Sequence, residues 1–195
     1  MRSTGVLVAA LTLSACAATS LPVDRYYRIG AATRHPAAPH SQSILVEPFE
    51  ARGVYAERAL LFQEAGSGSA MRQYGHQFWI EPPAAMLDAA LAAALRGAFG
   101  EANVHARVSR ERPDFQVQPR LRKLEQVIED GQARAAYAVD FTVTDRDGRP
   151  RFVLSFDESE PAATAGPDTY VAALDVLVAR ANARLVERLA TAFAR

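Results

Sequence analysis

Residues 134–144 read Arg-Ala-Ala-Tyr-Ala-Val-Asp-Phe-Thr-Val-Thr, and this stretch decides the fold class. Every second residue from Ala135 to Val143 is apolar, which is the period of a strand that buries one face. Turn-forming Asp, Gly and Pro follow within residues 145–150, and apolar residues then return at every second position from 152 to 156. The sequence therefore predicts an antiparallel hairpin.

Other stretches with strand character lie earlier in the chain. They are residues 24–29, 43–48, 59–64, 70–74 and 115–121. Aromatic and β-branched side chains dominate most of them. A Gly/Ser-rich tip at residues 66–69 indicates that 59–64 and 70–74 form a second hairpin. Pro119 restricts the last stretch to a sheet edge or a bulge, because proline cannot donate a ladder hydrogen bond.

Two stretches have helical periodicity. The first begins at Pro82-Pro83, and the second begins near Pro167. Their apolar residues recur at helical spacing: Met86, Leu87, Ala90, Leu91, Ala94, Leu95 and Phe99 in the first, and Tyr170, Leu174, Leu177, Val178, Ala181, Leu185, Leu189 and Phe193 in the second. We therefore expect an α+β domain, with a largely antiparallel sheet and two amphipathic helices packed on one face.

The single cysteine of the chain, Cys16, follows a short apolar run that begins soon after Arg2. This pattern is typical of a secretory signal peptide, and Leu13-Ser14-Ala15-Cys16 resembles the bacterial lipobox, in which the cysteine is acylated. The alternative is an ordinary signal peptide cleaved after an alanine, with Cys16 incidental. The expected organisation is a signal peptide at 1–15, a lipidated tether at 16–24 and a periplasmic domain at 25–195.

Residue 17 is alanine rather than aspartate. By resemblance to the enterobacterial sorting rule, the protein is expected at the outer membrane, lipid-anchored on the periplasmic side. Apart from the covalent lipid on Cys16, no cofactor is expected.

The sequence offers little support for catalysis, metal binding or nucleic-acid binding. Acidic and basic residues are equal in number, 22 each, which implies no basic face. Residues 66–70 lack the Gly-x-Ser-x-Gly nucleophile pattern. The four histidines have no ligand-type spacing. We therefore expect neither a catalytic nor a metal site, although a hydrolase that uses Ser67 or Ser69 stays as a minor alternative.

The aromatic residues Tyr74, Phe78 and Trp79 are the candidate contact for a partner or a lipid. Such side chains bring a large apolar area with a polar handle to interfaces, but they also fill cores. In a regular strand, Phe78 and Ile80 lie on one face and Trp79 on the other. At most one of these sets is then expected to face the core, and the other is the candidate surface.

Four motifs follow the lipobox-like segment in order along the chain: Tyr26-Tyr27-Arg28-Ile29, Ile44-Leu45-Val46-Glu47-Pro48, Val54-Tyr55-Ala56-Glu57-Arg58 and Gln73-Tyr74-Gly75-His76-Gln77-Phe78-Trp79-Ile80-Glu81-Pro82-Pro83. Their order resembles that of one known family, the ABC-type transport auxiliary lipoproteins, which include the paraquat-inducible protein C-like lipoproteins. The chain departs from the family pattern in its Gly/Ser-rich hairpin tip and in Phe78, where a basic residue often precedes the tryptophan.

The resemblance implies that residues 25–195 form a non-enzymatic auxiliary component of an intermembrane lipid transport system. Its implied partners are a mammalian-cell-entry domain protein with an ABC permease and ATPase, and its implied role is to dock that system at the outer membrane. Assembly as a homo-oligomer stays open. The alternative is a periplasmic carrier that binds a lipid or amphiphile within its own domain, beside the alanine-rich first helix.

Overall fold

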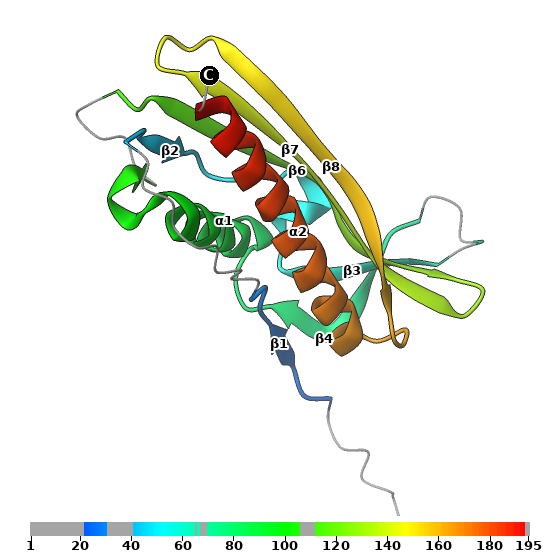
Figure 1. Cartoon of the computed structure of the whole chain (residues 1–195). Helices are drawn as coiled ribbons and strands as arrows, with labels where there is room; N and C mark the ends of the chain where they lie inside the picture. Colours follow the sequence, from blue (N-terminus) through cyan, green and yellow to red (C-terminus); the bar gives the residue numbers. More distant parts are fainter. Residues whose placement is uncertain (1–21, 31–40, 65, 67–69, 106–111, 194–195) are drawn as a thin grey trace, which may run out of the picture.

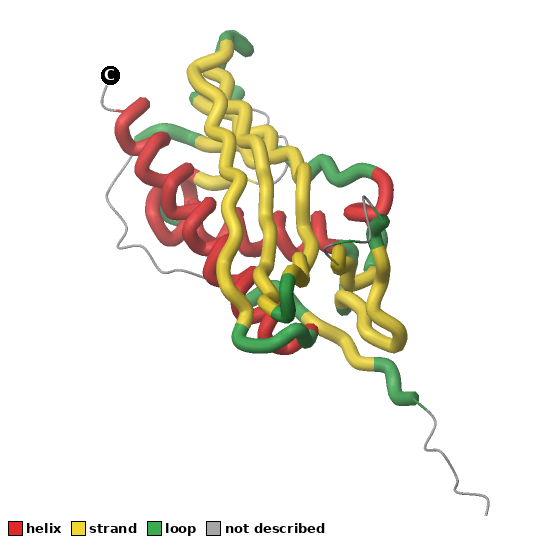
Figure 2. Tube along the Cα trace, turned by 90° about the vertical axis from the view of Figure 1, so that its right-hand side faces the viewer, coloured by secondary structure: helices red, strands yellow, loops and turns green. Residues whose placement is uncertain are grey.

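A curled, eight-stranded mixed sheet wraps around two long helices in the computed structural model of the chain (Figure 1). The structure describes residues 22–30, 41–64, 66, 70–105 and 112–193. Figure 2 shows both helices on the same side of the sheet. The α+β class with two helices is therefore confirmed.

The elements follow one another in the order strands, helix, strands, helix. The strands are β1 (Arg25–Tyr27), β2 (Ile44–Val46), β3 (Ala59–Glu64), β4 (Arg72–Trp79), β5 (Val104–His105), β6 (Phe115–Glu129), β7 (Gln132–Asp145) and β8 (Pro150–Ala162). The helices are α1 (Pro83–Phe99) and α2 (Pro167–Phe193), with short 3₁₀ turns η1 (Gly53–Ala56) and η2 (Glu101–Asn103).

The sheet is mixed, and the expectation of a largely antiparallel sheet is wrong. Strands β7 and β8 form the antiparallel hairpin that the alternation predicts, and β6 pairs antiparallel with the other edge of β7. Along its other edge, however, β6 pairs in parallel first with β2 and then with β3. Strand β1 also pairs in parallel with β4, and β5 pairs in parallel with β2. Four of the seven pairings between the described strands are therefore parallel. Alternation in a strand indicates which face is buried, but not which neighbour it pairs with.

Pro119 lies in the middle of β6, where the neighbour on one edge changes from β2 to β3. Its carbonyl accepts the Glu50 N–H at 2.9 Å across this interrupted edge. The β6–β7 ladder on the opposite edge continues past it, with Pro119 opposite Phe141. The missing N–H of the proline therefore faces the interruption, which is the edge-like position that proline requires.

The core lies between the concave face of the sheet and the two helices. Tyr137, Val139 and Phe141 of β7 are completely buried, and so are Leu174 and Leu177 of α2. Burial of a side chain of this size stabilises the fold by about 1.5–3 kcal/mol. Within the described ranges, no helix has the length and apolar character needed to cross a membrane.

Candidate functional site

The predicted aromatic segment is divided between the two faces of β4. Trp79 is only 1% exposed, and its ring centre lies 6.1 Å from that of Tyr170 in α2. Phe78 points away from the core, and its ring centre lies 6.1 Å from that of Tyr26 in the neighbouring strand β1. The register pairs Tyr26 with Phe78, and Tyr27 with Trp79. Trp79 thus belongs to the core, and the side chains of Phe78 and Tyr26 form a surface.

This surface contains Tyr26, Arg58, Phe78 and Ile80, and we call it the β1–β4 patch. Tyr26 and Ile80 are 55% and 39% exposed. The Arg58 guanidinium carbon lies 5.6 Å from the centre of the Tyr26 ring, which is within the range of a cation–π contact. The patch thus combines aromatic, aliphatic and cationic groups.

Backbone hydrogen bonds hold the β1–β4 patch in place. The Ile80 N–H donates to the Tyr27 carbonyl at 2.8 Å, and the Trp79 N–H donates to the Arg58 carbonyl at 2.8 Å. The Arg58 Nε–H in turn donates to the Trp79 carbonyl at 2.9 Å. Because Trp79 is itself buried, these bonds fix the patch to the core.

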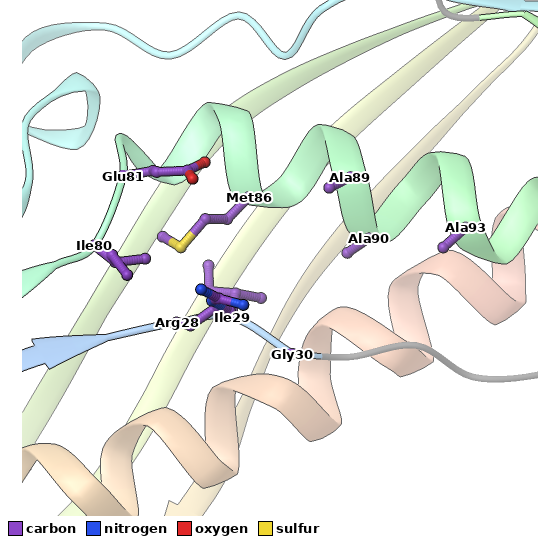
Figure 3. Close-up of a pocket in the computed structure, with 9 residues that line it drawn as sticks. All are labelled: Arg28, Ile29, Gly30, Ile80, Glu81, Met86, Ala89, Ala90 and Ala93. Atoms are coloured by element: carbon purple, nitrogen blue, oxygen red, sulfur yellow. The ribbon is translucent and has the colours of Figure 1, made fainter.

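An apolar groove of about 320 Å³ continues from the β1–β4 patch along α1 (Figure 3). Ile80 belongs to both features. The groove is lined by Arg28, Ile29, Gly30, Ile80, Glu81, Met86, Ala89, Ala90 and Ala93. The small alanine side chains of α1 leave space between this helix and residues 28–30. The two charged lining residues are Arg28, which follows β1, and Glu81, which precedes α1.

Asp175 of α2 fixes residues 28–30 beside this groove. Its Oδ1 accepts the Gly30 N–H at 2.9 Å. Burial raises the pKa of the Asp175 carboxyl, and the hydrogen bond from Gly30 offsets this only in part. The partly desolvated carboxylate of Asp175 on α2 therefore holds residues 28–30 in place beside the groove.

Tyr74 lies on the inner side of β4 and belongs to a buried polar cluster. Its hydroxyl donates to Gln126 Oε1, and its ring centre lies 4.6 Å from that of Phe62. Burial raises the pKa of Tyr74, and the charge of Glu64 raises it further. The Tyr74 ring therefore packs beside Phe62 and Gln126, apart from the contact between Phe78 and Tyr26.

The other members of this cluster are Tyr55, Glu125, Gln126 and Tyr170. The Tyr55 hydroxyl donates to Glu125. Burial raises the pKa of Tyr55, and the hydrogen bond to Glu125 raises it further. Burial also raises the pKa of Tyr170, with added contributions from Glu125 and the neighbouring tyrosines. Within the described residues, Tyr170 Oη and Gln126 Nε2 are buried without a hydrogen-bond partner.

The sequence prediction gave only the beginning of this strand, at residues 115–121, and did not reach Glu125 and Gln126. It used Arg58 only as a family mark, and Tyr26 only as part of the first strand and of a family motif. The alternation of Tyr26 and Tyr27 could have indicated that one of these rings faces outward.

The described part of the chain contains no group of three or more His, Cys, Asp or Glu side chains that could hold a metal ion. His76 lies on β4 with Nδ1 2.9 Å from Asp24 Oδ1, and His105 lies on β5. Cys16, Ser67 and Ser69 lie outside the described residues.

Solved structures share this combination of two helices and a curled mixed sheet. A crystal structure of a protein from Xanthomonas campestris is similar with a TM-score of 0.70 and 16% identity, covering 83% of this chain and 92% of that one. A crystal structure of an uncharacterised protein has a TM-score of 0.70 and 15% identity, covering 86% and 99%. A hypothetical protein from Chlamydia trachomatis has a TM-score of 0.52 and 10% identity, covering 76% and 96%.

At these identities the structures establish the fold alone, and comparison with curated protein sequences finds no match. The family model described as the ABC-type transport auxiliary lipoprotein component matches residues 27–186. This range runs from the end of β1 to within α2. The chain therefore belongs to the ABC-type transport auxiliary lipoprotein family, as the sequence motifs predicted.

Proposed function

We propose that this protein is a lipid-anchored, non-enzymatic component that docks an ABC/mammalian-cell-entry type lipid transport system at the periplasmic side of the outer membrane. The observation that carries the proposal is the family match over residues 27–186. It supports a role in ABC-type transport, and the lipobox-like Cys16 upstream of it supports the anchor.

The role of Cys16 in this proposal is to hold the domain at a membrane surface. A buried acyl chain contributes about 0.8 kcal/mol per methylene group, and two or more chains give stable attachment. In the sequence, Cys16 precedes the first residue of β1, Arg25, by only nine positions. The anchor thus keeps the β1 end of the domain close to the membrane.

Cell fractionation tests the anchor. Wild-type protein is expected in the membrane fraction, and the Cys16→Ser variant is expected in the soluble periplasm. Ser14→Ala is the matched control, because it changes a neighbouring residue and retains the thiol. Equal membrane association of wild type and Cys16→Ser would contradict the anchoring role.

Co-purification tests the partners. A tag at the C-terminus of the chain is expected to recover a mammalian-cell-entry protein together with an ABC permease and ATPase from gently solubilised envelopes. Recovery of the chain without them, under conditions in which permease and ATPase stay associated with each other, would contradict this part of the proposal.

The groove along α1 supports a second candidate, a carrier that binds the acyl chain of a lipid within its own domain. Native mass spectrometry of the Cys16→Ser protein would detect a co-purified lipid without interference from a covalent one. Ala89→Leu and Ala93→Leu fill the groove and are expected to abolish such binding. Ala172→Leu, at an exposed site on α2, is the control. Absence of bound lipid from the Cys16→Ser protein would contradict the carrier function.

A further inference from the structure

We propose that the β1–β4 patch rests against the phospholipid headgroup layer of the membrane that holds Cys16. Tyr26, Phe78 and Ile80 would lie at the boundary between headgroups and acyl chains, with Arg58 near the phosphates. This inference rests on the anchoring role proposed above, and it adds a direct contact between the folded domain and lipid.

The covalent length of the tether limits how far the patch can be from the anchor. Arg25 lies nine positions after Cys16, and at about 3.3–3.6 Å per position the chain between them reaches at most about 32 Å. Tyr26 is the next residue in the chain. Figure 1 places β1 at one end of the molecule and the turn between β7 and β8 at the other. The anchor therefore directs the end that carries the patch toward the membrane.

Apolar exposure is concentrated at this end of the molecule. Of the six most exposed large apolar side chains in the described ranges, Tyr26 and Ile80 belong to the patch and Val23, 79% exposed, lies just before it. The others, such as Val153 of β8 and Val176 of α2, lie on separate elements. Contiguous apolar exposure is typical of an interaction surface, whereas isolated apolar residues are ordinary.

The chemistry of the patch suits a phospholipid interface. Tyrosine is amphipathic and favours the boundary between headgroups and acyl chains. Arginine binds phosphate oxygens through its planar group of donors. In the described structure no carboxylate forms an ion pair with Arg58, whereas Asp24 beside the patch is paired with His76. Apart from its Nε–H, which donates to the Trp79 carbonyl, the Arg58 guanidinium is thus available to a phosphate.

Paramagnetic NMR with a chemically supplied anchor tests the contact. The chain from Cys16 onward retains every described residue, and its thiol can be coupled to a maleimide phospholipid in nanodiscs of phosphatidylethanolamine and phosphatidylglycerol. A gadolinium-chelate headgroup lipid then broadens methyl signals close to the headgroup layer. We expect strong broadening at Ile80 and little at Val153 and Val176. Equal or greater broadening at Val153 or Val176 would overturn the proposal.

The tether by itself would bring the β1 end near the membrane. A pair of double variants therefore distinguishes the effect of the patch from the effect of the tether. Tyr26→Asp with Phe78→Asp is expected to reduce the broadening at Ile80 at least twofold. Val153→Asp with Val176→Asp is the control and is expected to leave it unchanged. Unchanged broadening of the Ile80 signal in the patch variant would overturn the proposal. The proposal would also be overturned if an added mammalian-cell-entry protein, or a second copy of this chain, covered Ile80 in place of lipid and so removed the broadening. Because the anchor is supplied chemically, these results do not depend on whether cells acylate Cys16.

Discussion

Adjacent residues of β4 have opposite roles. Trp79 packs on Tyr170 in the core, and Phe78 lies against Tyr26 at the surface. The alternation in the sequence predicted this separation, but it could not indicate which of the two residues is buried. The choice depends on α2, which covers the Trp79 face and lies about ninety residues further along the chain.

Alanine substitutions of these two residues are expected to differ in cost. Trp79→Ala removes a fully buried ring and should lower the free energy of unfolding by about 3–5 kcal/mol. Phe78→Ala removes a partly exposed ring and should cost less than half of that. Urea denaturation at neutral pH measures both values. Equal costs would contradict the assignment of Trp79 to the core and Phe78 to the surface.

The buried tyrosines give a second comparison at the residue scale. Tyr170→Phe removes a hydroxyl that has no partner among the described residues, so it should leave stability unchanged or raise it by about 1 kcal/mol. Tyr55→Phe removes the donor to Glu125 and should lower stability by about 1.5–3 kcal/mol. The same denaturation assay ranks the two variants, and a less stable Tyr170→Phe would show that its hydroxyl is hydrogen-bonded after all.

At the scale of elements, local patterns predicted both helices and the β7–β8 hairpin. Asp130-Gly131, with φ values of +50° and +76°, forms the two-residue turn between β6 and β7. This Asp-Gly pair is a hairpin signal in the sequence, and it would have indicated where the strand that begins at residues 115–121 ends. The parallel pairings of β1 and β2 could not be predicted, because strands of three residues carry too little pattern to specify a distant partner.

The link between α2 and Gly30 predicts a pH dependence. Burial raises the pKa of Asp175 above its unfolded value of about 3.9, so the native state binds this proton at a higher pH than the unfolded state does. The contribution of Asp175 to stability is therefore present at acid pH and is lost as the pH rises through the folded pKa. Asp175→Asn can still accept the Gly30 hydrogen bond but has no charge. Its stability relative to wild type should be highest at pH 7, and this gain should disappear below about pH 4.

Asp114→Asn is the control with the opposite sign. Hydrogen bonds from Ser43, together with Arg146, hold the pKa of Asp114 below its usual value. Its contribution is present at neutral pH and is lost as the pH falls through the folded pKa, so Asp114→Asn should be less stable than wild type at pH 7, by a margin that shrinks in acid. Urea titrations of both variants from pH 3 to pH 7 measure these differences. If Asp175→Asn lost stability at pH 7 as Asp114→Asn does, the desolvation of Asp175 would be contradicted.

At the scale of the whole molecule, the fold places the strand that follows the predicted anchor at one edge of the sheet. Among the described strands, β1 is an edge strand that pairs only with β4, whereas β6 pairs with three neighbours. The family match and the order of motifs agree on the class of protein, and the sequence alone was sufficient for that conclusion. Assembly as a homo-oligomer stays a prediction, and light scattering of the Cys16→Ser protein would measure it.

The anchor and the folded domain are expected to be independent of each other. Among the described residues, the first buried member of the hydrophobic core is Ile29. Membrane association is expected to be lost in Cys16→Ser. The thermal unfolding midpoint of this variant should nevertheless agree within about 2 °C with that of the wild-type protein extracted in detergent, when both are measured in the same detergent. Circular dichroism measures the midpoint, and a large fall would mean that the lipidated segment contributes to the fold.

Intact mass spectrometry of the mature protein, extracted from envelopes, tests whether a lipid on the single cysteine holds the domain at the membrane. We expect a chain that begins at Cys16 and is heavier than the polypeptide by the mass of a diacylglyceryl group, with or without a further acyl chain. A mature chain that begins at another residue, or an unmodified Cys16, would contradict it.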